Sequence, residues 1–193
     1  MARSSRRGIF CVEGAWGPTF TNKSTVRPLL EVLDGQNQLR FIYRDAATVE
    51  EFEHYLKKWT QKQYASYDLG YLAFHGHAGG LLIGQVDYSL DRLGELLKGR
   101  LAGRILHFGT CETLGVDRAE ADRFRAVTQA RAICGYTRDV DWIESAAFDL
   151  NLFQLVAGSE RIDTGFKALQ RNHGGACERL GLRALWRTGA IWP

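Results

Sequence analysis

The stretch LGYLAFHGHAGG, residues 69–80, carries the clearest indication of the fold. It begins as a nearly uninterrupted apolar run, which is typical of a strand buried on both faces, and it ends in two histidines and three glycines. A second stretch, RILHFGTCET at residues 104–113, repeats the pattern and runs into Cys111. Each stretch predicts a buried strand with a chemically reactive side chain at its carboxyl end.

The rest of the chain alternates in the same way. Further apolar runs predict strands over residues 8–13, 39–43 and 130–136, and helical patterns cover residues 24–33, 48–61, 89–101 and 144–156. Thr48 and Glu51 have the spacing of a capping box at the start of the second helix. Strands that alternate with helices predict an α/β protein with a mostly parallel sheet.

Length and composition narrow the class of protein. With 193 residues, 45% of them hydrophobic, the chain suits one domain with a substantial core. A net charge of +3 gives no reason to expect a nucleic-acid or membrane partner, and no stretch approaches the length of a membrane span. The four cysteines are far apart and form no C-x-x-C pair, so we expect free thiols in a reducing cytoplasm.

The two strand ends suggest nucleophilic catalysis. Functional groups of parallel sheets gather at the carboxyl ends of the strands, and neighbouring strands lie about 5 Å apart. If the strands that end at His75 and Cys111 are neighbours, an imidazole can take the thiol proton and make the sulfur a nucleophile. The backbone amides of Gly76 and Cys111 are then natural donors to an oxyanion.

These motifs resemble the core of caspase-like cysteine peptidases of clan CD. In that family a strand ends in His-Gly, a glycine-rich turn and a helix follow, and a second strand ends in a small residue and Cys; the Cys-Glu-Thr at residues 111–113 is especially similar to bacterial CHAT-type members. The resemblance covers residues 8–156 and implies a three-layer αβα sandwich. It predicts one caspase-like domain over residues 1–193, with a helical segment at about 160–193.

The resemblance also implies an activity and its partners. It predicts a cysteine endopeptidase that needs no cofactor or metal, with His75, Cys111 and Gly76 as catalytic residues and a polypeptide as substrate. The segment after residue 136 contributes in the family to the substrate pocket, so we expect Asp139, Asp141 and Trp142 to bind the substrate and favour a basic side chain. A bacterial signalling or defence role, a regulatory protein partner and a homodimer are all compatible with the resemblance.

Two departures from the family bear on specificity and activation. Caspases have Gln two residues before the nucleophile, and relatives that cut after basic residues have Asp there, whereas this chain has Gly109. The interval between Cys111 and Arg131 also leaves little room for the linker that caspase zymogens cleave.

The sequence leaves other functions open, as well as the roles of the other histidines. His77 is a second candidate base, and together with His75 it resembles the His-x-His entry motif of metal-dependent hydrolases. A catalytically silent caspase-like binding module is a further alternative. His107, Cys11 and Cys134 lie inside apolar runs and are expected to be core residues.

Overall fold

A computed structural model describes residues 7–19 and 21–192, and its centre is a seven-stranded sheet. The strand order is β10-β9-β8-β7-β3-β1-β2, in which β8, β7, β3, β1 and β2 run parallel and the last two strands of the chain are antiparallel. These strands are β1 (Gly8–Glu13), β2 (Arg40–Asp45), β3 (Leu69–Ala73), β7 (Ile105–Phe108), β8 (Ala132–Tyr136), β9 (Leu182–Trp186) and β10 (Gly189–Ile191).

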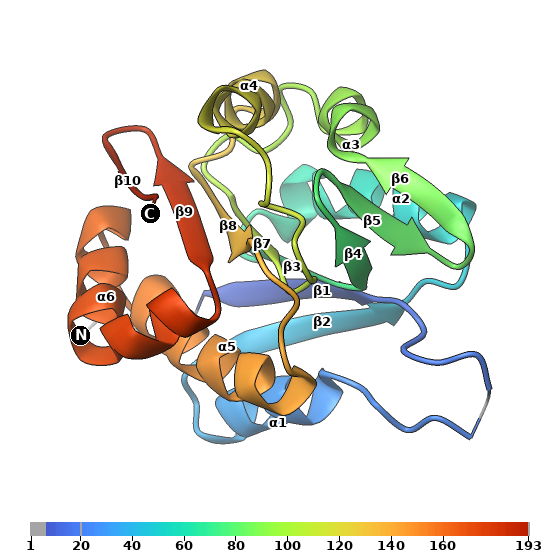
Figure 1. Ribbon diagram of the computed structural model, residues 1–193, viewed down its shortest axis with the longest axis horizontal. Coiled ribbons are helices and arrows are strands. Elements are labelled where there is room, and N and C mark those ends of the chain that lie inside the picture. The colour runs from blue at the N-terminus through green and yellow to red at the C-terminus, as the bar shows by residue number, and fades with distance from the viewer. Residues whose placement is uncertain (1–6, 20, 193) are drawn as a thin grey trace.

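Helices cover both faces of the sheet, so the predicted three-layer α/β architecture is confirmed (Figure 1). One face carries α2 (Val49–Trp59), α3 (Leu90–Leu96) and α4 (Arg118–Thr128), and the other carries α1 (Arg27–Gly35), α5 (Trp142–Ala157) and α6 (Ile162–Arg179). A short 3₁₀ helix, Lys62–Tyr64, precedes β3. Each face has its own apolar core, and the sheet contributes alternate side chains to each. The capping box of Thr48 and Glu51 is present at the start of α2.

The strands that carry the two motifs are neighbours. β3 and β7 pair in parallel, with Tyr71 opposite His107 and Leu72 opposite Phe108. Three residues beyond this last pair come His75 and Cys111, so both motifs leave the sheet at the same edge. The crossover between the strands contains α3, as the helical pattern predicts.

The chain departs from the expected elements in three places. Between β3 and α3 it forms a small antiparallel sheet of β4 (His75–His77), β5 (Gly80–Ile83) and β6 (Val86–Ser89), where only a glycine-rich turn was expected. The interval after Cys111 contains α4. The segment expected to be helical over about 160–193 contains α6 and then the strands β9 and β10, because its short apolar run LRALW pairs with β8.

None of the helices in the described residues is long and apolar enough to cross a bilayer.

Candidate functional site

His75 stands where the chain leaves the central sheet and enters the small one. Its imidazole is exposed, and the Nε2 atom lies 3.2 Å from the backbone carbonyl oxygen of Trp16. The Trp16 indole also packs against the imidazole edge to face, with 5.3 Å between the ring centroids. Since a carbonyl oxygen can only accept, Nε2 carries the proton in this contact. In the neutral ring, Nδ1 is then the nitrogen that can take up a proton.

Cys111 lies half-buried in the turn after β7, against the backbone of Gly76. A Cβ atom on Gly76 would lie 2.7 Å from the Cys111 carbonyl oxygen and 2.7 Å from Thr113 Oγ1, so no larger residue fits there without a shift. The backbones of the His-Gly and Cys segments are thus in contact. In the described chain no hydrogen bond joins the His75 ring to the Cys111 thiol, and the imidazole Nε2 bonds to Trp16.

Hydroxyl groups hold the Cys111 turn against the small sheet. Thr113 donates to the carbonyl oxygen of Gly80 at 2.9 Å, and Thr110 therefore donates to Thr113 across 2.6 Å. Glu112 has a φ of 56°, a left-handed conformation that lets the chain reverse directly after the cysteine. The turn therefore has fixed partners on both sides of Cys111.

The surroundings of Cys111 keep its thiol protonated. Burial raises the pKa of the Cys111 thiol, and the Asp139 carboxylate beside it and the neighbouring Glu112 raise it further, whereas the backbone amide of Val140 lowers it. The pKa stays above its ordinary value in total. Such a thiol is a weak nucleophile at neutral pH until a base removes its proton.

Asp139, Asp141 and Trp142 occupy different environments. Asp139 lies at the thiol, as just described. Asp141 is the N-cap of α5 and accepts a hydrogen bond from the Glu144 amide at 2.9 Å. Trp142 is the first residue of that helix and packs, half-buried, against the core of the α5 face. Only Asp139 therefore contacts Cys111 among the three residues that we expected to bind substrate.

The other histidines have partners of their own. The Nε2 atom of His77 lies 2.9 Å from Asp87 of β6. His107 is fully buried and hydrogen-bonded to Asp149, which confirms it as a core histidine. Within residues 7–19 and 21–192, no group of three or more His, Cys, Asp and Glu side chains has the arrangement needed to hold a metal ion.

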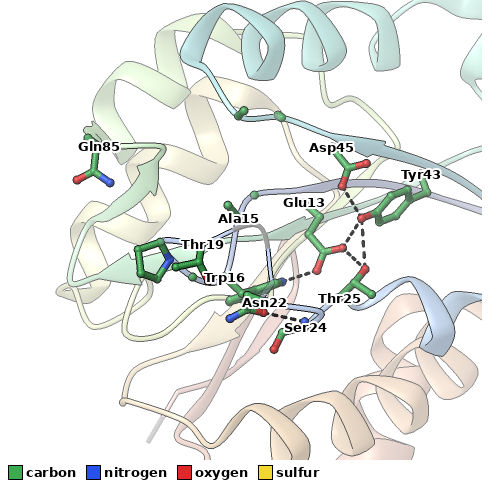
Figure 2. A pocket seen from close by; sticks show the side chains of 15 residues that line it. Glu13, Ala15, Trp16, Thr19, Asn22, Ser24, Thr25, Tyr43, Asp45 and Gln85 are labelled. Atoms are coloured by element: carbon green, nitrogen blue, oxygen red, sulfur yellow. Dashed lines mark hydrogen bonds between the residues drawn. The ribbon is translucent and has the colours of Figure 1, made fainter.

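A cavity of about 450 Å³ lies at the carboxyl ends of β1 and β2 (Figure 2). One of the residues that line it is Glu13, which is 2% exposed and ends β1. The Glu13 carboxylate accepts hydrogen bonds from four donors on the loop and on β2: the Trp16 indole, the Val26 amide at 2.8 Å and the hydroxyls of Thr25 and Tyr43 at 2.6 Å each.

The cavity is linked to the candidate dyad through one residue. Trp16 offers its carbonyl oxygen to His75 and its indole to Glu13, so the loop after β1 joins the two places. Figure 2 shows the Tyr43 hydroxyl between Glu13 and Asp45, 2.6 Å from an oxygen of each. This cavity was not predicted from the sequence. The available signal was an acidic residue, Glu13, directly at the end of an apolar strand.

Comparison with solved structures identifies the fold. Caspase-1 from Spodoptera frugiperda is similar over 86% of this chain and 76% of its own, with a TM-score of 0.56 and 16% identity. The pro-sf-caspase-1 structure has a TM-score of 0.54 and 16% identity over 85% of this chain and 76% of its own. The Drosophila initiator caspase Dronc has a TM-score of 0.53 and 10% identity over 90% of this chain and 72% of its own. The chain therefore has a caspase-like fold.

Comparison with protein sequences gives the family. A search of curated proteins found no match. One family model matches residues 6–186, and its description is a family of unknown function, DUF6642. This match covers most of the chain, and the protein accordingly belongs to the DUF6642 family.

Proposed function

We propose that this protein is a cysteine endopeptidase in which His75 and Cys111 form the catalytic dyad. The observation that carries the proposal is the contact of Gly76 with the Cys111 backbone, because it brings the His-Gly and Cys segments to one edge of a caspase-like sheet. The thiol with a raised pKa needs a base, and His75 is the histidine that adjoins this contact.

The reaction begins when His75 Nδ1 takes the proton from Cys111 Sγ. The thiolate attacks the carbonyl carbon of the peptide bond, and the backbone N–H groups of Gly76 and Cys111 donate to the oxyanion. The C–N bond breaks, His75 returns the proton to the amine that leaves, and a thioester remains. Water then attacks the thioester, its proton goes to His75, and the acid and the thiol are released. Substrate binding has to turn the His75 ring from Trp16 toward Cys111 for this step.

The same site favours a cationic side chain in the substrate. Asp139 lies at the thiol, and Asp45 is an exposed carboxylate that lines the cavity together with Trp16, so two carboxylates are available to attract a cationic side chain. Asp141 and Trp142, which follow Asp139, are proposed to line the same subsite. In keeping with the resemblance to CHAT-type bacterial peptidases, we place this activity in a reducing cytoplasm, where the thiols stay free.

Labelling with a peptidyl-arginine chloromethyl ketone tests the activity. We expect intact-mass analysis to find one adduct on Cys111, because the other three cysteines are buried. Cys111→Ala should abolish the adduct and His75→Ala should slow its formation, whereas His77→Ala should not. Equal labelling of wild type and His75→Ala would refute the dyad.

A matched probe tests the substrate preference. Citrulline has the shape of arginine without its charge, so replacing arginine by citrulline in the probe isolates the electrostatic contribution. We expect slower labelling with citrulline in wild type and a smaller difference in Asp139→Asn. An identical ratio in both proteins would remove Asp139 from specificity.

The second candidate function is a catalytically silent binding module. The observation in its favour is that the His75 imidazole bonds to Trp16 in the described structure and not to the thiol. Retained folding together with no adduct from any peptidyl electrophile would support this alternative.

A further inference from the structure

The buried carboxylate of Asp149 has no part in the proposed reaction. Asp149 lies on α5, is 1% exposed and points into the sheet rather than to solvent. Its Oδ2 atom accepts from the Tyr71 hydroxyl at 2.7 Å, and its Oδ1 atom accepts from the Tyr136 hydroxyl at 2.5 Å and lies 2.8 Å from Nε2 of His107. Three donors thus satisfy one buried carboxylate, and removal of this carboxylate would leave all three donors without their acceptor.

The three donors come from three adjacent strands of the sheet. Tyr71 belongs to β3, His107 to β7 and Tyr136 to β8, and Tyr71 and His107 are opposite one another in the register. The Asp149 carboxylate therefore bonds to the three strands whose carboxyl ends lead to His75, Cys111 and Asp139. Tyr71 is four residues before His75, His107 is four residues before Cys111 and Tyr136 is three residues before Asp139.

The positive charge of His107 strengthens the hydrogen bonds of this cluster. Burial lowers the pKa of His107, but the Asp149 carboxylate and the Cys134 sulfur, 3.3 Å from Nδ1, raise it to about 10 in total. His107 is then an imidazolium at neutral pH and donates from both ring nitrogens, to Asp149 and to Cys134. Hydrogen bonds between ionised groups are shorter and stronger than those between neutral ones.

The cluster also touches the turn before the candidate nucleophile. The Tyr71 ring occupies the space where a side chain at residue 109 would begin, so Gly109 is required by the position of this ring. Tyr71 in turn stacks on His107, with ring centroids 5.4 Å apart and an angle of 22° between the planes. The position of the Asp149 carboxylate is thus transmitted through Tyr71 to the backbone two residues before Cys111.

We propose that Asp149 is a positioning residue of the His75/Cys111 site, which holds the ends of β3, β7 and β8 in the register that brings the two catalytic segments together. The proposal rests on the proposed peptidase function. Asp149 does not contact the reacting atoms. It acts through Tyr71, His107 and Tyr136, and its effect should therefore fall on the rate of the bond-forming step rather than on binding of the peptide.

The test measures inactivation by the peptidyl-arginine chloromethyl ketone as a rate constant at saturation, kinact, and a half-saturation concentration, KI. For Asp149→Asn we expect kinact to fall by about tenfold or more while KI stays within about twofold. Tyr136→Phe removes one donor and leaves the ion pair, so it should lower kinact by a smaller factor and serves if Asp149→Asn does not fold. Nitrogen NMR of His107 should show an imidazolium in wild type at pH 8 and a neutral ring in Asp149→Asn.

A matched variant separates positioning from loss of stability. Phe166→Leu alters a buried aromatic residue of α6 that stacks on Trp186, far along the sheet from the dyad, and should lower the melting temperature with kinact unchanged. Wild-type kinact in folded Asp149→Asn or Tyr136→Phe, with His75 still required, would overturn the positioning role alone. Labelling of wild type that does not depend on His75 would instead overturn the peptidase function, and the positioning role with it.

Discussion

Gly76 and Cys111 are in backbone contact, with room for no Cβ atom between Gly76 and the Cys111 carbonyl oxygen. This contact joins β4, the first strand of the small sheet, to the turn after β7, and Thr113 reinforces it through its bond to Gly80. The position of Cys111 therefore depends on the absence of a side chain on Gly76.

Gly76→Ala is expected to displace the Cys111 turn. The added methyl group meets backbone and a buried hydroxyl, so we expect a loss of about 1–3 kcal/mol of unfolding free energy and a tenfold or greater fall in Cys111 labelling. Chemical denaturation and probe kinetics measure the two effects. Gly174→Ala is the control, since nothing lies within 4 Å of its Cβ position in α6. Wild-type labelling of Gly76→Ala would show that the contact is dispensable.

Asp139→Asn is expected to make Cys111 more reactive toward a small neutral reagent. Removal of the carboxylate lowers the thiol pKa, because one of the causes that raise it is gone. Alkylation by iodoacetamide at pH 7 should accelerate by about twofold or more, because a larger fraction of the thiol is then ionised. Asp122→Asn, which removes an exposed carboxylate paired with Arg118, should leave the rate as it is. A slower rate in Asp139→Asn would contradict the electrostatic effect.

Glu13→Gln is expected to loosen the loop that borders the cavity. An amide nitrogen cannot accept from the donors that now meet the carboxylate, so the buried site loses at least one hydrogen bond. We expect a cost of about 2–4 kcal/mol in urea unfolding and faster hydrogen exchange in the loop after β1. Glu31→Gln, which breaks only an exposed pair with Arg27, should cost at most about 0.5 kcal/mol. Equal costs for the two variants would show that Glu13 does not organise the loop.

The protein is expected to lose stability in alkaline solution through His107. Its folded pKa of about 10 lies above the ordinary value of 6.5. The stabilisation is therefore fully present below about pH 6.5 and is lost as the pH rises through 10. Between these values one group contributes a fall of up to about 1.4 kcal/mol per pH unit. Chemical denaturation of wild type and His107→Gln from pH 7 to 10 measures how the unfolding free energy of each depends on pH. The difference between the two proteins gives the contribution of His107, because Cys134, Tyr71 and Tyr136 are present in both. Parallel curves would show that His107 does not hold a proton in the folded protein.

Most of the central sheet could be predicted because β1, β3, β7 and β8 are short, buried and mostly apolar runs. The α4 helix escaped prediction, since only Ala121, Phe124 and Thr128 of its residues are buried among many charged ones. The small sheet escaped for a different reason, because its strands have only three or four residues and two of them, β4 and β5, contain a glycine. Both elements depend on tertiary contacts more than on local periodicity.

The residues around the candidate site also differ in whether local sequence patterns or tertiary packing place them. The placement of His75 and Cys111 at one edge of the sheet could be predicted from two strand ends and one crossover, which are local features. The Glu13 cavity depends on pairing of β1 with β2, which brings Tyr43 and Asp45 to Glu13. The role of Asp149 depends on packing of α5 over three strands, and its one signal in the sequence was an acidic residue next to Phe148 in an apolar helix.

Helix α4 has a consequence for how the proposed peptidase could be activated. It occupies the connection between β7 and β8, with its N-terminus capped by Asp117, and Arg183 of β9 donates to the carbonyl oxygens of Leu114 and Val116 just before it. A protease that cut within α4 would first have to unfold a capped helix. Folded structure therefore joins β7 to β8, and we expect activation of the proposed peptidase to move side chains such as His75 and Trp16 in an intact chain.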